Sequence, residues 1–350
     1  MPLSALIGPR TDPTPIFEAF RGSYGTELLT AAVAHLGLFA RLAERPQSPA
    51  ALRADLQLAE RPACVLFTAL RAMQLIYTNA QGNLQLTPLA QEHLGPSAEF
   101  DVSDYLGLAA ESPGVLEMVR RLKANRPAGA DQAEGAAFIF RPGESSAMEH
   151  EASARRLTLA LAGRAKNVAP ALAEQAPLEG SRRLLDVGGG TGIYSVALLQ
   201  KHATLTAVVW DRPEVLKVAS EMAVAYGVAD RLALLPGDMF SDPLPPGIDA
   251  ILLSNILHDW DVPACRALIG RCAAALPTGG RLLIHDVFLN DALDGPLAIA
   301  LYSAALFTLT EGRAYSAAEY RGWLAEAGLT PQEVRATHIH CGVLPAVKGG

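Results

Sequence analysis

The stretch Leu184-Leu185-Asp186-Val187-Gly188-Gly189-Gly190-Thr191-Gly192 decides the fold. Its first residues are typical of a buried strand, and its glycines permit a tight turn into a helix that is expected to begin near Ile193. Such a turn lets the backbone approach a ligand closely, and the helix start offers unpaired N–H groups. The GxGxG spacing differs from the dinucleotide fingerprint GxGxxG, so no pyrophosphate site is indicated. A purely structural turn remains the alternative interpretation.

Downstream of this stretch, short apolar runs alternate with longer segments. The candidate strands cover residues 184–187, 206–210, 232–235, 250–254 and 281–287. Each is followed by a segment long enough for a helical crossover, which predicts an α/β fold with a parallel, doubly wound, Rossmann-like sheet. The last portion, residues 334–347, is expected to supply an antiparallel edge hairpin.

Upstream, apolar residues recur at helical spacing from about residue 16 to residue 94. Residues 77–86 predict a short hairpin with a Gly-containing turn, and Thr87-Pro88 is a typical helix start. Helices followed by a small β wing form a winged-helix pattern. The expected domains are a mostly helical winged-helix domain over 1–100, a helical bridge over 101–180 and the α/β domain over 181–350.

The composition excludes several classes of protein. The 350 residues carry a formal net charge of −7, which disfavours nucleic acid as a partner. The 4 cysteines form no CxxC pair, which argues against a disulfide framework, and nothing specifies converging ligands for a metal site. No apolar run reaches the length of a membrane span, and the amino terminus does not resemble a secretory signal. We therefore expect a cytoplasmic protein that does not contact membranes and whose first residues are a frayed tail.

Acidic residues follow two of the predicted strands. Asp211 ends the second strand, where a doubly wound sheet places a carboxylate against ribose hydroxyls. Asp238 and Met239 follow the third strand, and they would set a carboxylate near an exocyclic amine and a thioether against an adenine face. Each is also compatible with an ordinary strand-end turn. Their shared position at the carboxyl ends of successive strands favours a ligand site.

Four motifs together resemble a known family. They are LLDVGGGTG (184–192), VVWDRPEVL (208–216), PGDMF (236–240) and SNILHDWD (254–261). The chain resembles the class I S-adenosylmethionine-dependent methyltransferases and, more narrowly, the caffeate/hydroxyindole O-methyltransferase-like family with its bacterial natural-product members. The resemblance covers nearly the whole chain. It implies a homodimer that is intertwined through the N-terminal domain, with S-adenosylmethionine as donor and S-adenosylhomocysteine as product.

The resemblance also assigns the donor site. The implied residues are Gly188 and Gly190 beside the methionine moiety, Asp211 on the ribose, Asp238 and Met239 around the adenine, and Ser254 as a further donor contact. Arg155 or Arg156 is the candidate for the donor carboxylate, on approximate spacing only.

His258 is the residue on which the chemistry depends. By itself it is compatible with a helix-opening residue beside an Asp cap. In the family, a histidine at this position removes the proton from the acceptor hydroxyl, and Asp286 matches an acid that orients it. A second acid of the family is expected where this chain has Ala314, with Glu311 one turn away. This departure keeps a C- or N-methyltransferase open as an alternative to O-methylation.

Acidity favours the class of acceptor. A phenol with a pKa near 10 and a histidine with a pKa near 6.5 differ by about 3.5 units, or about 4.8 kcal/mol for full proton transfer. An aliphatic alcohol is a much weaker acid, so phenolic or enolic hydroxyls of small aromatic or polyketide-like molecules are predicted as acceptors. Two further alternatives are a nicotinamide-dependent oxidoreductase, disfavoured by the glycine spacing, and a winged-helix DNA regulator, disfavoured by the charge.

Overall fold

The structure is a computed structural model that describes residues 2–96, 98–127, 146, 148 and 150–350. The chain forms two compact units. Unit 1 consists of Met1–Phe17, Gly129–Phe288 and Ala317–Gly350, and unit 2 of Glu18–Ala128 and Leu289–Ser316. Both units therefore combine separate stretches of chain, which differs from the contiguous domains expected from the sequence.

A mixed sheet forms the centre of unit 1, in the strand order β10-β11-β7-β6-β3-β4-β5. The strands are β3 (Arg183–Val187), β4 (Thr206–Asp211), β5 (Leu232–Pro236), β6 (Ala250–Ser254), β7 (Arg281–Leu289), β9 (Leu329–Pro331), β10 (Arg335–Ala336) and β11 (Cys341–Lys348). The pairs from β7 to β5 are parallel, whereas β11 pairs antiparallel with β7, β9 and β10. The predicted parallel core and its antiparallel edge hairpin are confirmed.

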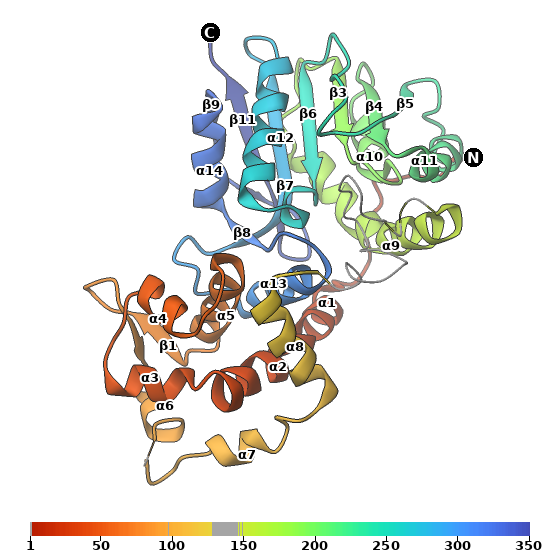
Figure 1. Cartoon of the computed structure of the whole chain (residues 1–350). Coiled ribbons are helices and arrows are strands. Elements are labelled where there is room, and N and C mark those ends of the chain that lie inside the picture. Colours follow the sequence, from red (N-terminus) through yellow and green to blue (C-terminus); the bar gives the residue numbers. More distant parts are fainter. Residues whose placement is uncertain (1, 97, 128–145, 147, 149) are drawn as a thin grey trace. The chain divides into compact units, whose positions relative to one another are not determined.

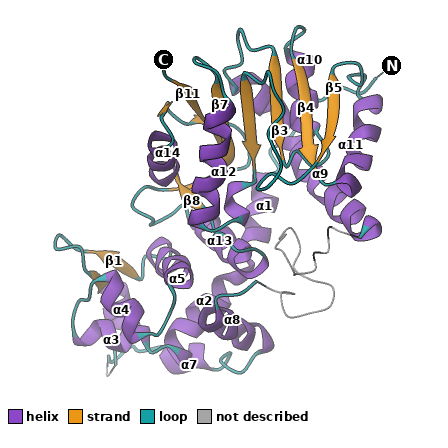
Figure 2. Ribbon diagram, turned by 45° about the horizontal axis from the view of Figure 1, so that its top comes forward, coloured by secondary structure: helices purple, strands orange, loops and turns teal. Residues whose placement is uncertain are grey.

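Helices cover both faces of this sheet, with α9, α10 and α11 on one face and α12 and α14 on the other (Figures 1 and 2). Their bounds are α9 (Glu151–Gln175), α10 (Ile193–Lys201), α11 (Pro213–Ala225), η4 (Leu257–Asp259), α12 (Val262–Ala275) and α14 (Ala317–Glu326). Helix α10 begins at the predicted residue, directly after the glycine turn. Of the predicted bridge over 101–180, residues 128–145, 147 and 149 lie outside the described part of the chain.

One predicted crossover helix is missing. Residues 237–249, which join β5 to β6, are described throughout and contain turns and bends but no helix. Pro243, Pro245, Pro246 and Gly247 stand in this connection. Proline removes backbone donors and glycine favours non-helical backbone, so the segment crosses the sheet end as a loop.

Leu3 and Ala5 are hydrogen-bonded within unit 1, so the expected frayed tail is wrong. The Leu3 N–H donates to the Ala225 carbonyl at 2.9 Å, and the Ala5 N–H donates to Gln200 Oε1 at 2.8 Å. The Gln200 amide in turn donates to the Leu3 carbonyl at 2.9 Å. These bonds attach the first residues to α10 and the end of α11, and Ala5 is buried there.

Unit 2 is mostly helical around its own apolar core, which includes Leu28, Leu66 and Phe307. Its elements are α1 (Thr14–Arg21, which begins in unit 1), η1 (Gly22–Tyr24), α2 (Gly25–Thr30), η2 (Ala31–His35), α3 (Leu38–Glu44), α4 (Pro49–Asp55), α5 (Glu60–Ala72), β1 (Ile76–Thr78), β2 (Leu84–Leu86), α6 (Pro88–His93), α7 (Ser103–Gly107), α8 (Pro113–Ala124), α13 (Leu297–Leu309) and β8 (Tyr315–Ser316). The antiparallel pair β1 and β2 confirms the predicted hairpin, and the Thr87 side chain caps α6 as expected.

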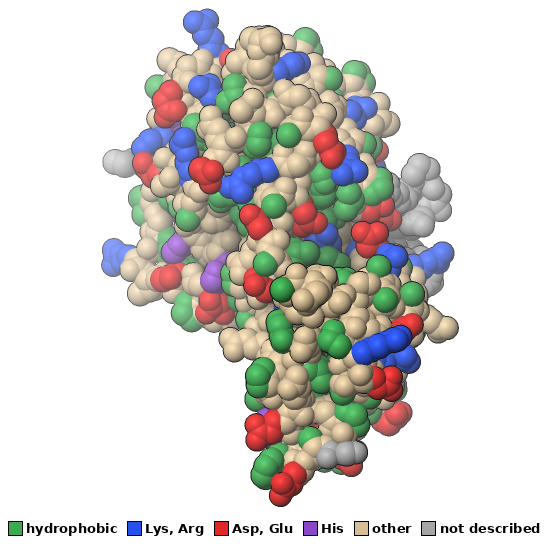
Figure 3. All heavy atoms as spheres, turned by 90° about the vertical axis from the view of Figure 1, so that its left-hand side faces the viewer, with side chains coloured by type: hydrophobic (Ala, Val, Ile, Leu, Met, Phe, Trp, Pro, Cys, Tyr) green, Lys and Arg blue, Asp and Glu red, His purple; other side chains and the backbone are tan. Residues whose placement is uncertain are grey.

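The surface and the cysteines agree with the composition. Figure 3 shows acidic and basic side chains interspersed over one face. All four cysteines are free thiols. Among the described residues, no single helix combines the length and the apolar composition of a membrane span, although one bent pair, Thr14–His35 with Leu38–Glu44, meets both criteria jointly.

Candidate active site

The glycine turn after β3 forms one wall of the site. Gly188, Gly190 and Gly192 have φ values of 64°, 59° and 69°, in the left-handed region that glycine adopts without strain. A Cβ at Gly188 would lie 2.5 Å from Ile256 Cδ1, so this glycine permits close packing against the segment after β6. A Cβ at Gly190 would meet nothing within 4 Å, which leaves room for a ligand at that point of the turn.

Asp211 lies beside this turn, as the sequence predicted. Its Oδ2 accepts a hydrogen bond from the Gly190 N–H at 2.8 Å, and its Oδ1 accepts one from the Arg212 N–H at 2.7 Å. Burial raises the pKa of Asp211 to about 6. A half-buried carboxylate held by backbone donors retains lone pairs that can accept hydrogen bonds from the hydroxyl groups of a ligand.

Asp186, at the end of β3, is buried and only half satisfied. Its Oδ2 accepts a hydrogen bond from the Ser195 hydroxyl at 2.7 Å, whereas its Oδ1 has no hydrogen-bond partner among the described residues. Burial raises the pKa of this carboxyl to about 7. A buried acceptor left over next to the glycine turn fits a ligand that carries N–H or O–H donors. The residues present therefore suit a polar donor molecule such as S-adenosylmethionine.

Asp238 and Met239 follow β5, in the loop toward β6. Asp238 Oδ1 accepts a hydrogen bond from the Phe240 N–H at 2.8 Å, and its Oδ2 forms an ion pair with Arg212 at 3.4 Å. Both side chains of this pair are about one third exposed, and Met239 is half-buried. Arg212 directly follows Asp211, so this ion pair connects Asp238, predicted to lie near the adenine, with the backbone beside Asp211. The two predicted carboxylates therefore lie on one side of the site.

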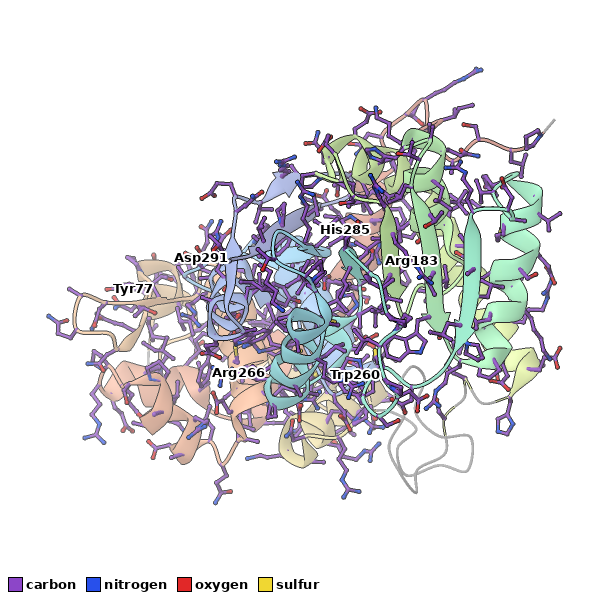
Figure 4. The ribbon with its side chains drawn as sticks, turned by 90° about the horizontal axis from the view of Figure 1, so that it is seen from above. Tyr77, Arg183, Trp260, Arg266, His285 and Asp291 are labelled. Carbon is purple, nitrogen blue, oxygen red and sulfur yellow. The ribbon has the colours of Figure 1, made fainter. Side chains whose placement is uncertain are left out.

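Ser254 ends β6 and contacts the buried histidine His285 of β7. Its Oγ lies 2.8 Å from His285 Nδ1, and His285 Nε2 lies 3.2 Å from the Thr337 hydroxyl. Burial lowers the pKa of His285 to about 3, so its ring is neutral at physiological pH. In Figure 4, His285 lies on the sheet. The Ser254 hydroxyl also accepts a hydrogen bond from the Asn255 amide at 3.0 Å.

His258 lies in the short turn η4 and pairs with Asp286 of β7, which joins the two predicted catalytic residues. The Nδ1 atom is 2.6 Å from Asp286 Oδ1, and both side chains are buried. Asp286 Oδ1 also accepts the Val287 N–H at 2.8 Å, which fixes the carboxylate. Because the carboxylate accepts the Nδ1 proton, Nε2 is the ring atom that can accept a proton.

Two acids determine the charge of His258. Burial acts to lower its pKa, but Asp286 and Asp259 together raise the pKa above its ordinary value of 6.5. Asp259 Oδ1 is 3.7 Å from His258 Nε2. Burial raises the pKa of Asp259 to about 6. The imidazole is thus bracketed by carboxylates on both nitrogens, an arrangement that stabilises its protonated form.

Three residues that were not singled out from the sequence complete this arrangement. Asp259 stands within the quoted motif, so its position beside His258 was the available signal. The Tyr320 hydroxyl of α14 donates to Asp286 Oδ2 at 3.3 Å, and Arg164 of α9 donates to the Asn255 side chain. Neither belongs to a recognisable local pattern, because each reaches the site through packing of a helix that is distant in the sequence.

The arginines proposed for the donor carboxylate lie elsewhere on α9. Arg155 forms two hydrogen bonds with Glu221 of α11, at 2.8 and 3.0 Å, on an exposed surface. Arg156 is exposed as well. In unit 2, Ala314 is buried and its N–H donates to the Ser303 hydroxyl at 3.1 Å. Within the described part of the chain, no group of three or more His, Cys, Asp or Glu side chains is arranged to hold a metal ion.

Comparisons with known proteins identify the family of the chain. The family model of the O-methyltransferase domain matches residues 132–330. A 3-hydroxy-5-methyl-1-naphthoate 3-O-methyltransferase from Streptomyces sahachiroi is 33% identical over 93% of this chain and 92% of its own length. An L-tyrosine C(3)-methyltransferase from Streptomyces lavendulae is 34% identical over 46% of this chain and 44% of its own length.

A solved structure is similar over the full length. It is an O-methyltransferase family 2 protein from Planctomyces limnophilus in complex with apigenin, with 49% identity, a TM-score of 0.87 and 99% coverage of both chains. The sequence motifs, the mixed sheet and these matches lead to one assignment. The chain belongs to the O-methyltransferase domain family and is an S-adenosylmethionine-dependent methyltransferase.

Proposed function

We propose that the protein transfers a methyl group from S-adenosylmethionine to a phenolic or enolic hydroxyl of a small aromatic or polyketide-like molecule, with His258 as general base. The observation that carries this proposal is the buried contact of 2.6 Å between His258 Nδ1 and Asp286 Oδ1. It holds one ring nitrogen protonated and leaves the other as the proton acceptor.

The residues of the chain divide the work. Gly188, Gly190 and Asp211 bind the donor, and Asp238 with Met239 and Ser254 complete its site. S-adenosylmethionine, when bound, supplies an electrophilic methyl group. His258 takes the hydroxyl proton at Nε2 while the oxygen forms its bond to the methyl carbon and the carbon–sulfur bond breaks. Asp286 orients the ring and stabilises the imidazolium that results.

The raised pKa of His258 suits a phenol. Asp286 and Asp259 raise that pKa against the effect of burial, which narrows the gap to a phenol with a pKa near 10. A base matched more closely to its substrate transfers the proton at a smaller free-energy cost. The named substrates of similar proteins agree with this class, since the Streptomyces sahachiroi relative acts on a hydroxynaphthoate and the Planctomyces protein was solved with apigenin.

A panel of acceptors tests the proposal. The full chain is incubated with methyl-labelled S-adenosylmethionine and with flavonoids, hydroxynaphthoates, catechols and aliphatic alcohols, and the mass and the methylated atom of each product are determined. O-methylated phenols with no methylated alcohols are expected. Nicotinamide binding without S-adenosylhomocysteine binding in calorimetry would contradict the donor assignment.

A C- or N-methyltransferase is the second candidate. Two observations favour it, namely Ala314 at the position of an expected acid and the partial match to an L-tyrosine C(3)-methyltransferase. The same panel extended with tyrosine and aminobenzoates decides between the two. A product methylated at carbon or nitrogen, formed at an unchanged rate by His258→Ala, would favour this candidate over O-methylation.

The expected homodimer is part of the proposal. Unit 2 exposes large apolar side chains, among them Phe20 at 76%, Tyr105 at 75% and Leu108 at 82%. Contiguous exposed apolar patches mark association surfaces, and this is the role that we propose for these side chains. Light scattering on the full chain is expected to give twice the monomer mass, and the triple change of these residues to Ser is expected to shift it toward the monomer. A monomeric parent would contradict this part.

A further inference from the structure

Asn255, between Ser254 and the turn that carries His258, adopts an unusual backbone conformation. Its φ is 57°, in the left-handed region that residues other than glycine, asparagine and aspartate rarely enter. Its N–H donates to the His285 carbonyl at 2.8 Å, which continues the pairing of β6 with β7 by one residue. Strand β6 ends at Ser254, and three residues after Asn255 the chain reaches His258 in η4. This left-handed residue therefore stands between the end of β6 and the turn that carries the histidine.

The Asn255 side chain connects three separate segments. Its Oδ1 accepts a hydrogen bond from the Arg164 guanidinium of α9. Its Nδ2 donates to Ser254 Oγ at 3.0 Å and approaches the Tyr194 hydroxyl at 3.5 Å. Tyr194 is the second residue of α10, directly after the glycine turn. The amide thus bridges the donor-binding turn and the turn that bears the base.

Arg164 is itself held in place. Its guanidinium lies 3.5 Å from the Sγ of Cys341, a buried residue at the start of β11. Its positive charge acts on His258 and Asp259, whose ionisation it influences. The positive charge of Arg164 thus opposes, from α9, the two carboxylates that contact His258, Asp286 of β7 and Asp259 of η4.

We propose that Arg164 and Asn255 are positioning residues, which fasten the His258 turn to the donor-binding glycine turn. The inference rests on the proposed function of that site. Arg164 acts through Asn255, whose left-handed conformation it locks, and neither residue needs to touch the reacting atoms. Displacements near 1 Å in a site that depends on alignment reduce turnover on the order of 10²-fold.

Four variants of the full chain test the inference. Arg164→Met removes the guanidinium and keeps an apolar stem, and Asn255→Gly keeps the left-handed backbone without the amide. Asn255→Asp retains the oxygen that accepts from Arg164 and is the conservative variant. Arg266→Met is the matched control, since Arg266 lies on α12 (Figure 4) in an exposed ion pair with Glu326.

The measurements are kcat, KM for donor and acceptor, S-adenosylhomocysteine affinity by calorimetry, and Tm. Arg164→Met and Asn255→Gly are each expected to lower kcat by about 10- to 10²-fold and to weaken S-adenosylhomocysteine binding several-fold, with the acceptor KM little changed. The double variant is expected to lose no more kcat and no more S-adenosylhomocysteine affinity than the more impaired single variant, because the two residues act together. Asn255→Asp retains most activity, and Arg266→Met matches the parent.

The pH profile supplies a readout that a merely structural role would not move. Removing the Arg164 cation is expected to shift the midpoint of kcat to higher pH, because Asp286 and Asp259 then act on His258 without it. Multiplicative losses in the double variant, an unchanged midpoint, or parent-like kcat and binding in both single variants would overturn the inference.

Failure of the proposed function looks different. Calorimetry with S-adenosylhomocysteine needs no acceptor, so the non-additive loss of binding tests the pair whichever atom the enzyme methylates. If the parent methylates carbon or nitrogen, the proposal of O-methylation is wrong. The coupling of Arg164 with Asn255 is then still tested by the binding measurements.

Discussion

Two buried histidines differ in charge, one in the turn η4 that follows β6 and one on the neighbouring strand β7. His258 contacts two carboxylates, and these raise its pKa, whereas His285 contacts the hydroxyls of Ser254 and Thr337, and burial lowers its pKa to about 3. His285 and Asp286 are consecutive on β7, so their side chains point to opposite faces of the sheet. Burial alone therefore does not raise the pKa of a histidine. The contact of His258 with the carboxylate of Asp286 does.

The largest expected effect comes from the histidine on the acid side. His258→Ala is expected to lower kcat by about 10²- to 10⁴-fold, because the general base is lost. S-adenosylhomocysteine affinity, measured by calorimetry, should stay near that of the parent. Added imidazole is expected to restore part of the rate by occupying the space left behind. Turnover equal to the parent would remove His258 from its role.

Removing the charge of Asp286 is expected to bring the pKa of His258 closer to that of His285. Asp286→Asn keeps an oxygen near His258 Nδ1 but removes its charge, and kcat is expected to fall on the order of 10²-fold. Burial then opposes the charged ring with Asp259 as its remaining acid, so the pKa falls. Activity requires the neutral ring and rises as pH passes through this pKa; the midpoint of the kcat profile should therefore move to lower pH. A midpoint that stays or rises contradicts the comparison.

His285 is expected to affect stability more than chemistry. Its pKa is lowered to about 3 in the folded protein, against 6.5 as the ordinary value. Below pH 6.5, His285 is therefore protonated in the unfolded chain but stays neutral in the folded protein. The free energy of unfolding falls as the pH drops further. The contribution is on the order of 2 kcal/mol between pH 6.5 and pH 5. Urea unfolding of His285→Gln should show a flatter pH dependence; an identical slope would refute this assignment.

The smallest expected effect is at Tyr320. Its hydroxyl donates to Asp286 Oδ2 at 3.3 Å. Tyr320→Phe removes this bond and leaves the ring in place, so we expect a loss of about 1 kcal/mol in stability and a change in kcat below about tenfold. A loss as large as that of Asp286→Asn would mean that the hydroxyl, not the carboxylate alone, orients His258. Thermal unfolding and steady-state kinetics measure both quantities.

Much of the fold followed from local patterns. The strands β3, β4, β5, β6 and β7 were predicted because each is an apolar run that ends at a polar or glycine-rich turn, and the β1 and β2 hairpin was predicted from its turn residues. The loop between β5 and β6 was mistaken for a crossover helix, since its length allowed one although its prolines did not. The attachment of Leu3 to Ala225 had no local signal, because it depends on a surface that is distant in sequence.

The site divides in the same way. His258, Asp286, Asp211 and Gly190 stand in motifs or at strand ends, and the structure brings them together in two pairs. Arg164 and Tyr320 come from helices whose sequences carry no mark of the site. Their positions depend on how α9 and α14 pack on the sheet, which is a long-range property of the folded chain.

The segmented course of the chain has a consequence for its synthesis. Strand β11, the last element of the chain, lies between β10 and β7 in the sheet and pairs with β7 from Cys341 to Val347. During translation the parallel strands emerge first and expose the edge of β7 until this last strand arrives. Unpaired strand edges favour association with other chains. Truncations within β11 would leave this edge of β7 unpaired and should therefore yield insoluble chains.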